Sequence, residues 1–411
     1  MKKHFLLIGS LLLTSMVYGA GFQLNLQGMR QLAMGGSGTA IPWDASTVFY
    51  NPGGLSALEN VQIYGSVNAL MPRARFAQAP TGTYTVDANS KTYTPFNLYV
   101  AGPLGYKTPW SFGVGVYTPF GTGIDWGKDW VGRFIIQDIS LQTIFIQPTV
   151  SYQIAENISL GAGFVYATGN VELNKAIPTI NSAGGEGQAR LTGRANGVGF
   201  NVGLHLTPSE DVVIGFTYRS QVNMKVKRGY AEFSNIPSTL SSSFVNTAFK
   251  SELPLPQVAS VGIGVHVSEK VTLQFDANYT GWASYDSLIF DFENNTSALS
   301  DSRSPRRYKS TVALRGGMHY QHSDRFALMV GTAYDPSPVR DGFVNPDLPD
   351  SKRILATGGL SFKLWERLTA IGVFEYVFAD VRTGTSNENG FTGKYQSRVV
   401  NPGIAITYDF K

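Results

Sequence analysis

The stretch AGFQLNLQGMRQLAMGGSGTAIPWDASTVFYNPGGLSAL, residues 20–58, fits no regular element of secondary structure. Glycine interrupts it repeatedly, so that neither a long helix nor a long strand is favourable. It is also too apolar for a disordered tail, because side chains such as Phe22, Leu32, Trp43 and Leu55 favour burial. A compact and irregular apolar segment must be shielded from water by other parts of the chain. We therefore expect the remainder of the chain to enclose residues 20–58.

The residues before this stretch are typical of a secretory signal peptide. Lys2 and Lys3 precede an apolar core at Phe5–Leu13, and small residues follow up to a predicted cleavage after Gly19. This core is too short to span a bilayer, and no later window approaches the roughly 18 apolar residues of a spanning helix. The sequence therefore predicts a signal peptide at residues 1–19 and export without a helical anchor, to the periplasm, the outer membrane or the exterior.

The composition excludes several classes of protein. The chain has no cysteine, so disulfides and thiolate metal sites are excluded. Removing the predicted signal peptide takes the formal net charge from +4 to +2, and no stripe of basic and aromatic residues is present, so nucleic acid is not an expected partner. Charged residues make up only 15% of the chain, against about 25% in a soluble domain. Together with 45 Gly, 25 Phe and 20 Tyr, this indicates a surface that faces lipid through aromatic girdles; the alternative is a soluble β-propeller or sandwich.

Beyond Leu58 the chain alternates runs of period two with clusters of turn residues, which is a pattern of β-strands. In the clearest run, Val271 and Leu273 lie on one face while Thr272 and Gln274 lie on the other. The fourteen predicted strands lie near residues 60–70, 96–105, 110–117, 139–154, 158–175, 188–207, 211–226, 257–267, 271–289, 308–320, 325–335, 353–364, 368–381 and 398–410.

The connections between these strands alternate between short and long without exception. The short ones lie at 106–109, 155–157, 208–210, 268–270, 321–324 and 365–367, and the long ones near 71–95, 118–138, 176–187, 227–256, 290–307, 336–352 and 382–397. Short periplasmic turns, longer extracellular loops and an even strand number are typical of an outer-membrane barrel. A propeller would repeat with a period of four strands, which the sequence does not show. We therefore predict an all-β fold, a 14-stranded antiparallel transmembrane β-barrel at residues 59–411, with residues 20–58 plugging its lumen.

The last predicted strand agrees with this fold. Ile404, Ile406, Tyr408 and Phe410 share one face, and a terminal aromatic strand is what the barrel-assembly machinery is expected to recognise as a partner during biogenesis. Lys411 follows the aromatic residue, which is a small departure from that pattern.

Two quoted stretches carry a resemblance to a known family. AGFQLN and the later DASTVFYNPGGL resemble the N-terminal hatch of the FadL family of outer-membrane long-chain fatty acid transporters. The usual hatch tripeptide of that family is Asn-Pro-Ala, whereas this chain has Asn51-Pro52-Gly53. RFALMVGTAYDPSPVRDGFVNPDLPDSKR at 325–353, DWVGRF and NYTGWASYDSL extend the resemblance over nearly the whole mature chain. The resemblance implies a hatch at residues 20–58 that moves around Asp44, Asn51, Pro52 and Gly53.

Several predicted strands place small or apolar residues on their inward face. In the run from Ile158 this face includes Val165, and in the run from Leu368 it includes Ile371 and Val373. A partly apolar lumen suits an apolar ligand, or the hatch alone. We therefore take Val165, Ile371 and Val373 as candidate ligand contacts.

A ligand with an anionic head group would require an inward cation. By parity Arg315 faces the lumen, while Arg133, Lys225 and Lys227 are weaker candidates near the mouth. A buried arginine normally has a carboxylate partner. The alternative for Arg315 is therefore a structural ion pair, and its predicted partners are Glu375, Asp276 or Asp409.

The predicted long loop 227–256 is rich in apolar residues. Phe244 and Phe249 fall on one side of a predicted short helix, together with Val245. An exposed apolar patch of this kind usually marks a binding surface, and the resemblance implies that it collects substrate. Its expected partner loop, 176–187, is short and rich in glycine.

Three residues indicate a weak place in the wall of the barrel. Pro148 lies inside a predicted strand, where proline removes a donor from the ladder, and Gly113 and Gly115 weaken the neighbouring hairpin. Family members release substrate sideways beside their third strand, so the resemblance implies a lateral opening here. The alternative is a harmless bulge.

The sequence does not indicate catalysis. His205, His266, His319 and His322 all lie at or near predicted periplasmic turns, and we find no nucleophile elbow, zinc-binding or calcium-binding motif. We therefore expect no enzymatic activity, no cofactor and no metal. The sequence and the resemblance together predict passive uptake of hydrophobic compounds, above all long-chain fatty acids, across the bacterial outer membrane, in contact with outer-membrane lipid and lipopolysaccharide. The alternatives are an aromatic-hydrocarbon channel, a general porin or structural barrel, and a lipid-hydrolysing enzyme.

Overall fold

A computed structural model describes residues 21–410, so the predicted signal peptide at 1–19 lies outside the described residues. The described chain forms a closed antiparallel barrel of 14 strands, as predicted. Closure comes from the pairing of β1 (Val61–Asn68) with β22 (Thr392–Phe410), in which Val61 lies opposite Phe410. Because its first and last strands pair, the closed sheet has no free edge strand. A β-barrel in a lipid bilayer requires this closure, since lipid cannot form hydrogen bonds with unpaired backbone groups.

Some barrel strands are single elements, and others consist of two elements in line. The single elements besides β22 are β7 (Asp138–Ala155), β8 (Ile158–Ile180), β9 (Glu186–Ser209), β18 (Phe326–Asp335) and β19 (Arg353–Trp365). The two-part strands are β1 with β2 (Met71–Gln78), β3 (Thr85–Asp87) with β4 (Phe96–Pro103), β5 (Trp110–Tyr117) with β6 (Gly121–Asp125), β10 (Val212–Arg219) with β11 (Val222–Ser234), β12 (Thr247–Leu255) with β13 (Val258–Ser268), β14 (Val271–Thr280) with β15 (Ser287–Phe292), β16 (Ser302–Pro305) with β17 (Thr311–Ser323), and β20 (Leu368–Ala379) with β21 (Arg382–Thr385).

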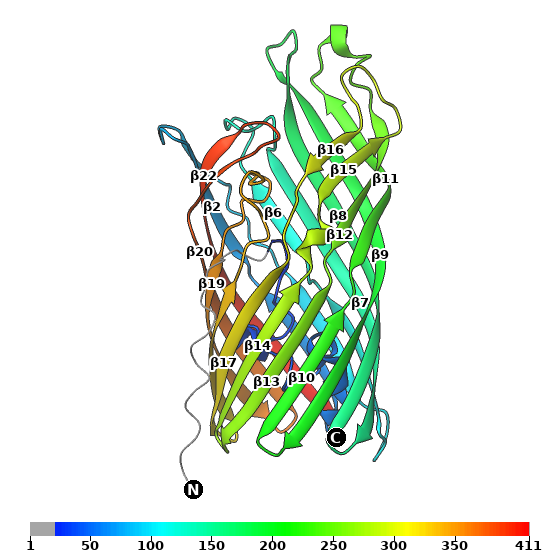
Figure 1. The fold of residues 1–411 in the computed structure, drawn as a ribbon, viewed down its shortest axis with the longest axis vertical. Coiled ribbons are helices and arrows are strands. Elements are labelled where there is room, and N and C mark those ends of the chain that lie inside the picture. Colours follow the sequence, from blue (N-terminus) through cyan, green and yellow to red (C-terminus); the bar gives the residue numbers. More distant parts are fainter. Residues whose placement is uncertain (1–20, 411) are drawn as a thin grey trace.

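The two ends of the barrel differ as the spacing of the sequence predicts. Tight turns such as 156–157 and 269–270 join strands at the lower end in Figure 1, where the chain also ends. At the upper end, β8, β9 and β11 extend well beyond β20 and β22. No helix among the described residues is long and apolar enough to span a bilayer.

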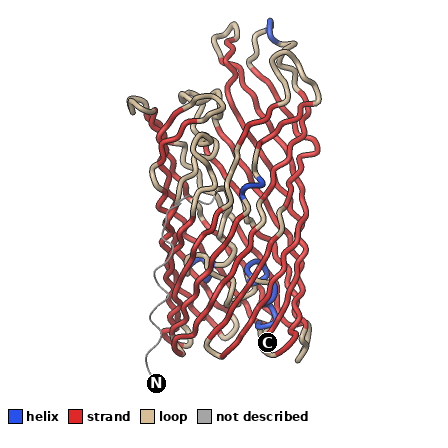
Figure 2. Tube along the Cα trace, viewed as in Figure 1, coloured by secondary structure: helices blue, strands red, loops and turns tan. Residues whose placement is uncertain are grey.

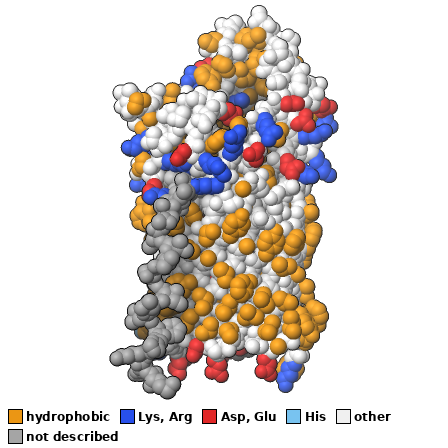
Figure 3. All heavy atoms as spheres, in the orientation of Figure 1, with side chains coloured by type: hydrophobic (Ala, Val, Ile, Leu, Met, Phe, Trp, Pro, Cys, Tyr) orange, Lys and Arg blue, Asp and Glu red, His pale blue; other side chains and the backbone are white. Residues whose placement is uncertain are grey.

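Side chains alternate between the outside and the inside of the wall. Phe374 and Phe378 of β20 are more than half exposed, whereas Ile371 and Val373 of the same strand are buried. This is the period-two geometry of a strand with different surroundings on its two faces. Figure 3 shows the outcome: apolar side chains cover the lower half of the visible face, and charged side chains gather above and below this band.

The N-terminal residues lie inside the lower half of the barrel. They form three short helices, α1 (Met29–Ala33), α2 (Thr47–Tyr50) and the 3-10 helix η1 (Pro52–Ala57), which Figure 2 shows enclosed by strands. Met29, Val48 and Leu55 are 0% exposed and belong to the same apolar core as inward-facing barrel residues. Glycine-rich connections separate these helices, because the segment must turn sharply within a narrow space. We call residues 21–58 the hatch.

The predicted long loop 227–256 is mostly strand. β11 continues to Ser234 and β12 begins at Thr247, so that only the helical turn η2 (Ser238–Leu240) and its neighbours are irregular. The prediction of a helix bearing Phe244 and Phe249 is therefore wrong. Phe249 lies in β12, is 2% exposed, and packs with its ring centroid 5.3 Å from that of Phe290. Phe244 is half-buried, with its ring centroid 5.8 Å from that of Phe233.

A break in the alternation explains this error. The register of β11 against β12 shifts between Val226 and Gly229, which is a β-bulge. The period-two pattern ends there in the sequence, although the strand continues. The predicted loop 176–187 is likewise a tight turn at 181–185 between β8 and β9.

The segment 336–352, between β18 and β19, keeps its predicted irregular character and packs inside the upper barrel. The indole Nε1 of Trp126 donates to the carbonyl of Pro346 at 2.9 Å. Asn345 and Asp350 are buried. The remaining helical turn, η3 (Trp282–Ser284), lies between β14 and β15, and Trp282 is 1% exposed. The upper lumen is therefore narrowed by chain that does not belong to the hatch.

Candidate functional site

Glycines of β8 and β9 allow the hatch to lie directly against the wall. A Cβ placed on Gly161 would be 2.3 Å from the carbonyl carbon of Pro52. A Cβ on Gly53 would be 2.8 Å from the carbonyl oxygen of Gly203. Any larger residue would separate the two backbones. The glycine at position 53, where the family tripeptide has alanine, therefore allows β9 to approach the hatch closely in this chain.

The predicted hatch residues hold this contact in place. The Asn51 amide Nδ2 donates to the carbonyls of Thr39 at 2.8 Å and Leu204 at 3.1 Å, and its Oδ1 accepts from the backbone N–H of Gly53 at 3.0 Å. Asn51 thus joins two parts of the hatch to β9. Asp44 is 1% exposed and accepts from the backbone N–H of Ser46 at 3.0 Å, so it orders the start of α2.

Asp276 of β14 is a second anchor of the hatch, although the sequence predicted it only as a partner for Arg315. Its Oδ2 accepts from the backbone N–H groups of Gly38 and Thr39, both at 2.9 Å, and from the Thr39 hydroxyl at 2.7 Å. Hydrogen bonds to a carboxylate are stronger than those to a neutral acceptor. The carboxylate therefore binds the turn between α1 and α2. The sequence signal for this role is that Asp276 lies on the inward face of the strand that begins at Val271.

Arg315 faces the lumen as predicted, but its predicted ion-pair partners are wrong. Its guanidinium pairs with Asp335 at 3.3 Å, and also donates to Asn278 Oδ1 at 3.1 Å and to the carbonyl of Gly35 at 3.2 Å. Register explains the pairing, because Arg315 lies opposite Ala333, two residues from Asp335 on the same inward face. Three protein acceptors thus fix the guanidinium beside the hatch.

Val165, Ile371 and Val373 also face inward, and all three are buried in the apolar core that contains the hatch residues. A Cβ on Gly359 would contact both the Ala33 side chain of α1 and Val373. None of the three lines either cavity described next. Their proposed role as ligand contacts in the closed state therefore has no support from the geometry.

An apolar cavity of about 90 Å³ lies above the hatch. We call it the lumen cavity. Side chains from seven strands and from segment 336–352 line it, among them Leu141, Val171, Met224, Leu253, Leu288, Phe290 and Leu348. Phe22 of the hatch forms part of its floor. Such a lining favours a hydrophobic ligand.

One arginine interrupts this apolar lining. Arg306 is only 6% exposed. It forms a bidentate ion pair with Asp347, in which Nη1 lies 3.1 Å from Oδ1 and Nη2 lies 2.7 Å from Oδ2. Its Nε is buried and has no hydrogen-bond partner among the described residues. Buried donors are rarely left unpaired in folded proteins. Arg306 is not among the residues predicted from the sequence, although its partner Asp347 lies within the family-like segment 325–353.

A second cavity, of about 440 Å³, adjoins the lumen cavity. We call it the side chamber. Phe22, Thr122, Leu141, Asp347 and Leu348 line both spaces, so these side chains form the partition between them. Phe22 is held by rings on several sides, with ring-centroid distances of 4.8 Å to Trp282, 5.9 Å to Tyr285 and 6.0 Å to Phe120. Movement of Phe22 with the hatch would join the two cavities.

The side chamber borders an irregular part of the third barrel strand. Between Tyr117 and Gly121 this strand has one residue more than the facing part of β7, which is a bulge between β5 and β6. The hatch occupies the break, because the N–H of Leu24 donates to the carbonyl of Pro119 at 2.8 Å and the N–H of Gly121 donates to the carbonyl of Phe22 at 3.0 Å.

Above the bulge the wall has few backbone hydrogen bonds on one side. β6 pairs with β7, but towards the second barrel strand the contacts of Asp125 are a bond from the N–H of Asn89 at 2.7 Å and an ion pair with Lys91 at 3.1 Å. The Tyr93 side chain covers this part of the wall, since a Cβ on Gly123 would lie 2.2 Å from its hydroxyl oxygen.

The residues predicted to form a lateral opening do not form this break. Pro148 lies opposite Val114 in an unbroken ladder between β5 and β7. The ladder to β8 lacks its pairs at Gln147 and Pro148, as the missing donor predicts, but resumes at Thr149 in the same register. The proline therefore weakens the pairing locally, and the prediction of a bulge there is wrong. Gly113 gives room to the hatch, because a Cβ there would lie 2.4 Å from Val48, and Gly115 gives room to Tyr99 at 2.7 Å. These glycines serve close packing rather than a weak ladder.

Outside the barrel wall, Arg133 forms an ion pair with Glu186 at the tip of β9, at 2.8 Å. Hydrogen bonding to this guanidinium holds the pKa of Glu186 below its usual range. The pair ties the segment between β6 and β7 to the β8–β9 hairpin. Neither residue lines either cavity.

A sequence model of the family described as outer membrane protein transport protein (OMPP1/FadL/TodX) matches residues 10–410. The chain belongs to this family. It is an outer-membrane transporter of hydrophobic compounds. The family-like stretches of the sequence therefore indicated the correct family.

Several relatives and solved structures are similar to nearly the whole chain. The chain is 24% identical to a putative outer membrane protein of Neisseria meningitidis serogroup B over 100% of this chain and 99% of that protein. It is 22% identical to the long-chain fatty acid transport protein of Escherichia coli K12 over 88% of each chain. The crystal structure of a Pseudomonas aeruginosa FadL homologue superposes with a TM-score of 0.82 at 19% identity, covering 95% of this chain and 100% of that one. The Pseudomonas putida toluene transporter TodX superposes with a TM-score of 0.71 at 16% identity, covering 93% and 98%.

The arrangement can bind and pass a hydrophobic molecule. Among residues 21–410, no cluster of three His, Asp or Glu side chains has the geometry of a metal site. His205 and His319 lie in the lower barrel against the hatch: His205 lies beside Gly54, and the ring centroid of His319 is 4.6 Å from that of Trp43. The lumen cavity thus offers mainly apolar side chains together with Arg306 and its partner Asp347, and the side chamber adds the basic side chains of Lys91 and Arg353.

Proposed function

We propose that this family member takes up long-chain fatty acids by passive diffusion, without catalysing a reaction. The observation that carries the proposal is the guanidinium of Arg306 in the otherwise apolar lumen cavity, with its Nε unpaired. A fatty acid offers an alkyl chain to such a lining and a carboxylate to such a donor. The fatty acid transport function of the E. coli relative supports the same substrate class.

The proposed path runs from the upper loops through the lumen cavity and past Phe22 into the side chamber. From there the ligand would leave sideways, beside Tyr93 and the bulge at 118–120, or downwards after the hatch shifts around Asp44, Asn51, Pro52 and Gly53. A ligand can drive such a shift only if it binds one position of the hatch more tightly than the other. Because Phe22 belongs both to the hatch and to the partition, ligand in the lumen cavity would act on the hatch directly.

The second candidate function is a channel for aromatic hydrocarbons. It is favoured by the aromatic rings of Phe22, Tyr285, Phe290 and Tyr308 around the lumen cavity, and by the likeness of the fold to TodX. A hydrocarbon has no charge, so it would gain nothing from Arg306. This difference separates the two proposals.

The test compares uptake of oleate and of toluene by cells carrying Arg306→Gln. Loss of a charge-assisted hydrogen bond costs about 1.5–3 kcal/mol, which is roughly a 10- to 150-fold loss in binding. We expect this loss for oleate and unchanged uptake of toluene. Arg303→Gln is the matched control, because Arg303 lies three residues earlier and is exposed.

A further variant separates ligand binding from folding. Arg306→Gln leaves Asp347 buried without its partner, so Arg306→Gln/Asp347→Asn restores a neutral pair while still removing the guanidinium. We expect this double variant to fold and still to bind oleate weakly. Wild-type binding of oleate by the double variant would refute the role of Arg306. Uptake of toluene but not oleate by the wild type would favour the hydrocarbon channel.

A further inference from the structure

The outward face of β7, β8, β9 and β11 changes from apolar to charged over four successive outward-facing rungs of the ladder. The rungs, read from β7 towards β11 and from the lipid-facing band upwards, are Ile146–Tyr166–Val198, then Ile144–Thr168–Asn196–Lys225, then Gln142–Asn170–Arg194, then Ser140–Glu172–Thr192–Tyr230. The first rung is exposed and apolar. The upper rungs carry hydroxyl, amide, ammonium and guanidinium groups, together with the carboxylate of Glu172.

The β-bulge in β11 adds two further cations to this face. The pairing of β11 with β9 shifts between Lys225 and Tyr230. In a regular strand, successive side chains point to opposite faces, but a bulge changes their direction. Lys227 and Arg228 are consecutive and both are exposed. The guanidinium of Arg228 lies 5.8 Å from the centroid of the Tyr230 ring.

Only some of these cations are neutralised by the protein. Arg190 lies between Glu172 at 2.9 Å and Glu232 at 3.7 Å, and Lys225 is 3.9 Å from Glu252. The remaining cations of this face, Arg194, Lys227 and Arg228, form no ion pair within residues 21–410. Because Arg190 is shared by two glutamates, the five cations of this face (Arg190, Arg194, Lys225, Lys227 and Arg228) meet three carboxylates, which leaves a net charge of +2 on the outer wall.

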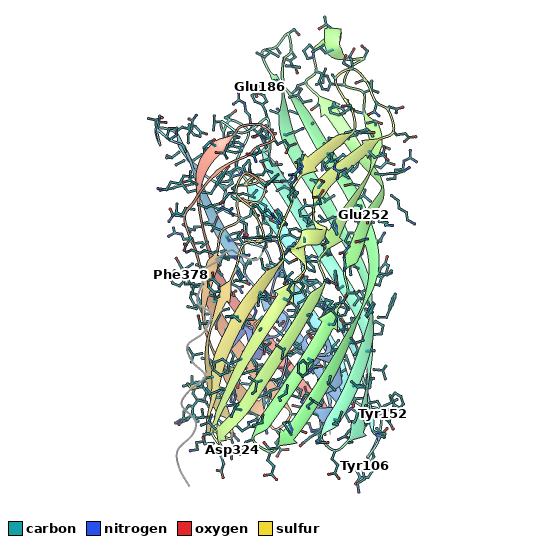
Figure 4. The ribbon with its side chains drawn as sticks, viewed as in Figure 1. Tyr106, Tyr152, Glu186, Glu252, Asp324 and Phe378 are labelled. Carbon is teal, nitrogen blue, oxygen red and sulfur yellow. The ribbon has the colours of Figure 1, made fainter. Side chains whose placement is uncertain are left out.

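These groups surround a hollow of about 520 Å³. Its polar lining consists of Arg194, Arg228, Ser140, Gln142, Asn170, Thr192, Tyr230 and Glu172, and the Glu172 carboxylate is paired with Arg190 at 2.9 Å. Glu252, which marks the neighbouring strand, lies higher along the barrel than the outward-facing Phe378 (Figure 4). On the face drawn in Figure 3, charged side chains likewise begin where the apolar band ends. The hollow thus lies at the level of lipid head groups, directly above the apolar rung.

We propose that this hollow binds the phosphorylated sugar head group of a glycolipid in the outer leaflet, the lipid A portion of lipopolysaccharide. Guanidinium groups bind phosphate with two parallel hydrogen bonds, which suits Arg194 and Arg228. The hydroxyl and amide side chains supply partners for sugar hydroxyls. The acyl chains continue downwards over Ile146, Tyr166 and Val198. A free phosphate ion would use the cations alone and would leave the apolar rung without a role.

The test is native mass spectrometry of the purified, detergent-solubilised full chain with three probes: diphosphoryl lipid A, dephosphorylated lipid A and inorganic phosphate. We expect the wild type to retain one diphosphoryl lipid A and to bind the dephosphorylated form at least about tenfold more weakly. Arg194→Gln/Arg228→Gln should lose the same preference. Added salt should weaken binding to the wild type, because exposed charges are screened.

The control is Lys107→Gln/Lys270→Gln, which removes two exposed cations from the turns at the opposite end. Lys107 also lies over a tyrosine ring, at 5.3 Å from its centroid, as Arg228 does. Both double variants change only exposed side chains, and their thermal unfolding verifies that they fold. Equal lipid binding by the Arg194/Arg228 variant and the wild type would overturn the proposal. So would equal loss in the control, equal binding of dephosphorylated lipid A, or displacement of the lipid by equimolar inorganic phosphate.

Discussion

Replacing Asp276 by asparagine should release the hatch while leaving the barrel closed. The side chain keeps its shape, but Oδ2 loses the charge that attracts two backbone N–H groups and one hydroxyl of the turn at 38–39. The other carboxylate oxygen has no hydrogen-bond partner among the described residues, so the new Nδ2 would be buried without an acceptor. Both changes favour an undocked hatch.

The size of the effect follows from these contacts. Hydrogen bonds to a charged group contribute about 1.5–3 kcal/mol and those between neutral groups about 0.5–1.5 kcal/mol, so the loss is about 1 kcal/mol per bond. Three bonds give about 3 kcal/mol, and relief from burying a charge reduces this to about 2–3 kcal/mol. The population of undocked hatch should therefore rise roughly 30- to 150-fold.

The assay uses the absence of cysteine in the chain. Ser37→Cys places a single thiol in the hatch at a position that is 0% exposed, so a maleimide reacts with it only when the hatch undocks. When closing is faster than labelling, the labelling rate is proportional to the open population. We expect Asp276→Asn to raise this rate by the factor given above, measured in the Ser37→Cys background.

Asp324→Asn is the control, because Asp324 is exposed on a lower turn (Figure 4) and should leave the labelling rate unchanged. Circular dichroism and thermal unfolding establish that both variants keep the barrel. A labelling rate within twofold of the parent for a folded Asp276→Asn variant would refute the reasoning, because it would mean that these bonds do not hold the hatch.

Two other substitutions test the packing directly. Gly161→Ala should displace the hatch by about 1 Å, because its Cβ would lie 2.3 Å from the backbone of Pro52, whereas ordinary contact begins at 3.4 Å. This displacement should raise ion leakage through the barrel in planar bilayers. Gly372→Ala has open space around its Cβ and should not raise leakage, so equal conductance of the two variants would contradict this account. Phe249→Ala should lower the free energy of unfolding by about 3–5 kcal/mol because it empties a buried site, whereas Phe378→Ala, 55% exposed on the outer wall, should cost far less in the same denaturant titration. A small loss at Phe249 would instead restore the interpretation of this residue as an exposed contact for substrate.

Local pattern was enough to predict the barrel. The period-two runs and the alternation of short and long connections follow from neighbouring residues, since each strand presents one face to lipid and the other to the lumen. The predicted bounds 110–117 coincide with β5. The prediction of a long loop at 227–256 failed at the bulge after Val226. An extra residue there reverses the alternation of side chains, although the strand continues.

The site required contacts that no local pattern contains. Parity alone placed Arg315 in the lumen, but its partner Asp335 depends on the register of β17 against β18, and its contact with Gly35 depends on how the hatch folds. The same fold of the hatch fills the space beside Val165 and leaves the lumen cavity higher up, beside Arg306.

The sequence by itself thus determined the barrel, the number of strands, the family and which side chains face inwards, because these depend on alternation along each strand and on short quoted motifs. The tertiary structure alone decided which inward side chains contact the hatch and which line a cavity. It also decided that exposed cations from β9 and β11 meet on the outer wall. The physical reason is that these contacts join residues far apart in the chain, whose meeting depends on register, on bulges and on the volume that the hatch occupies.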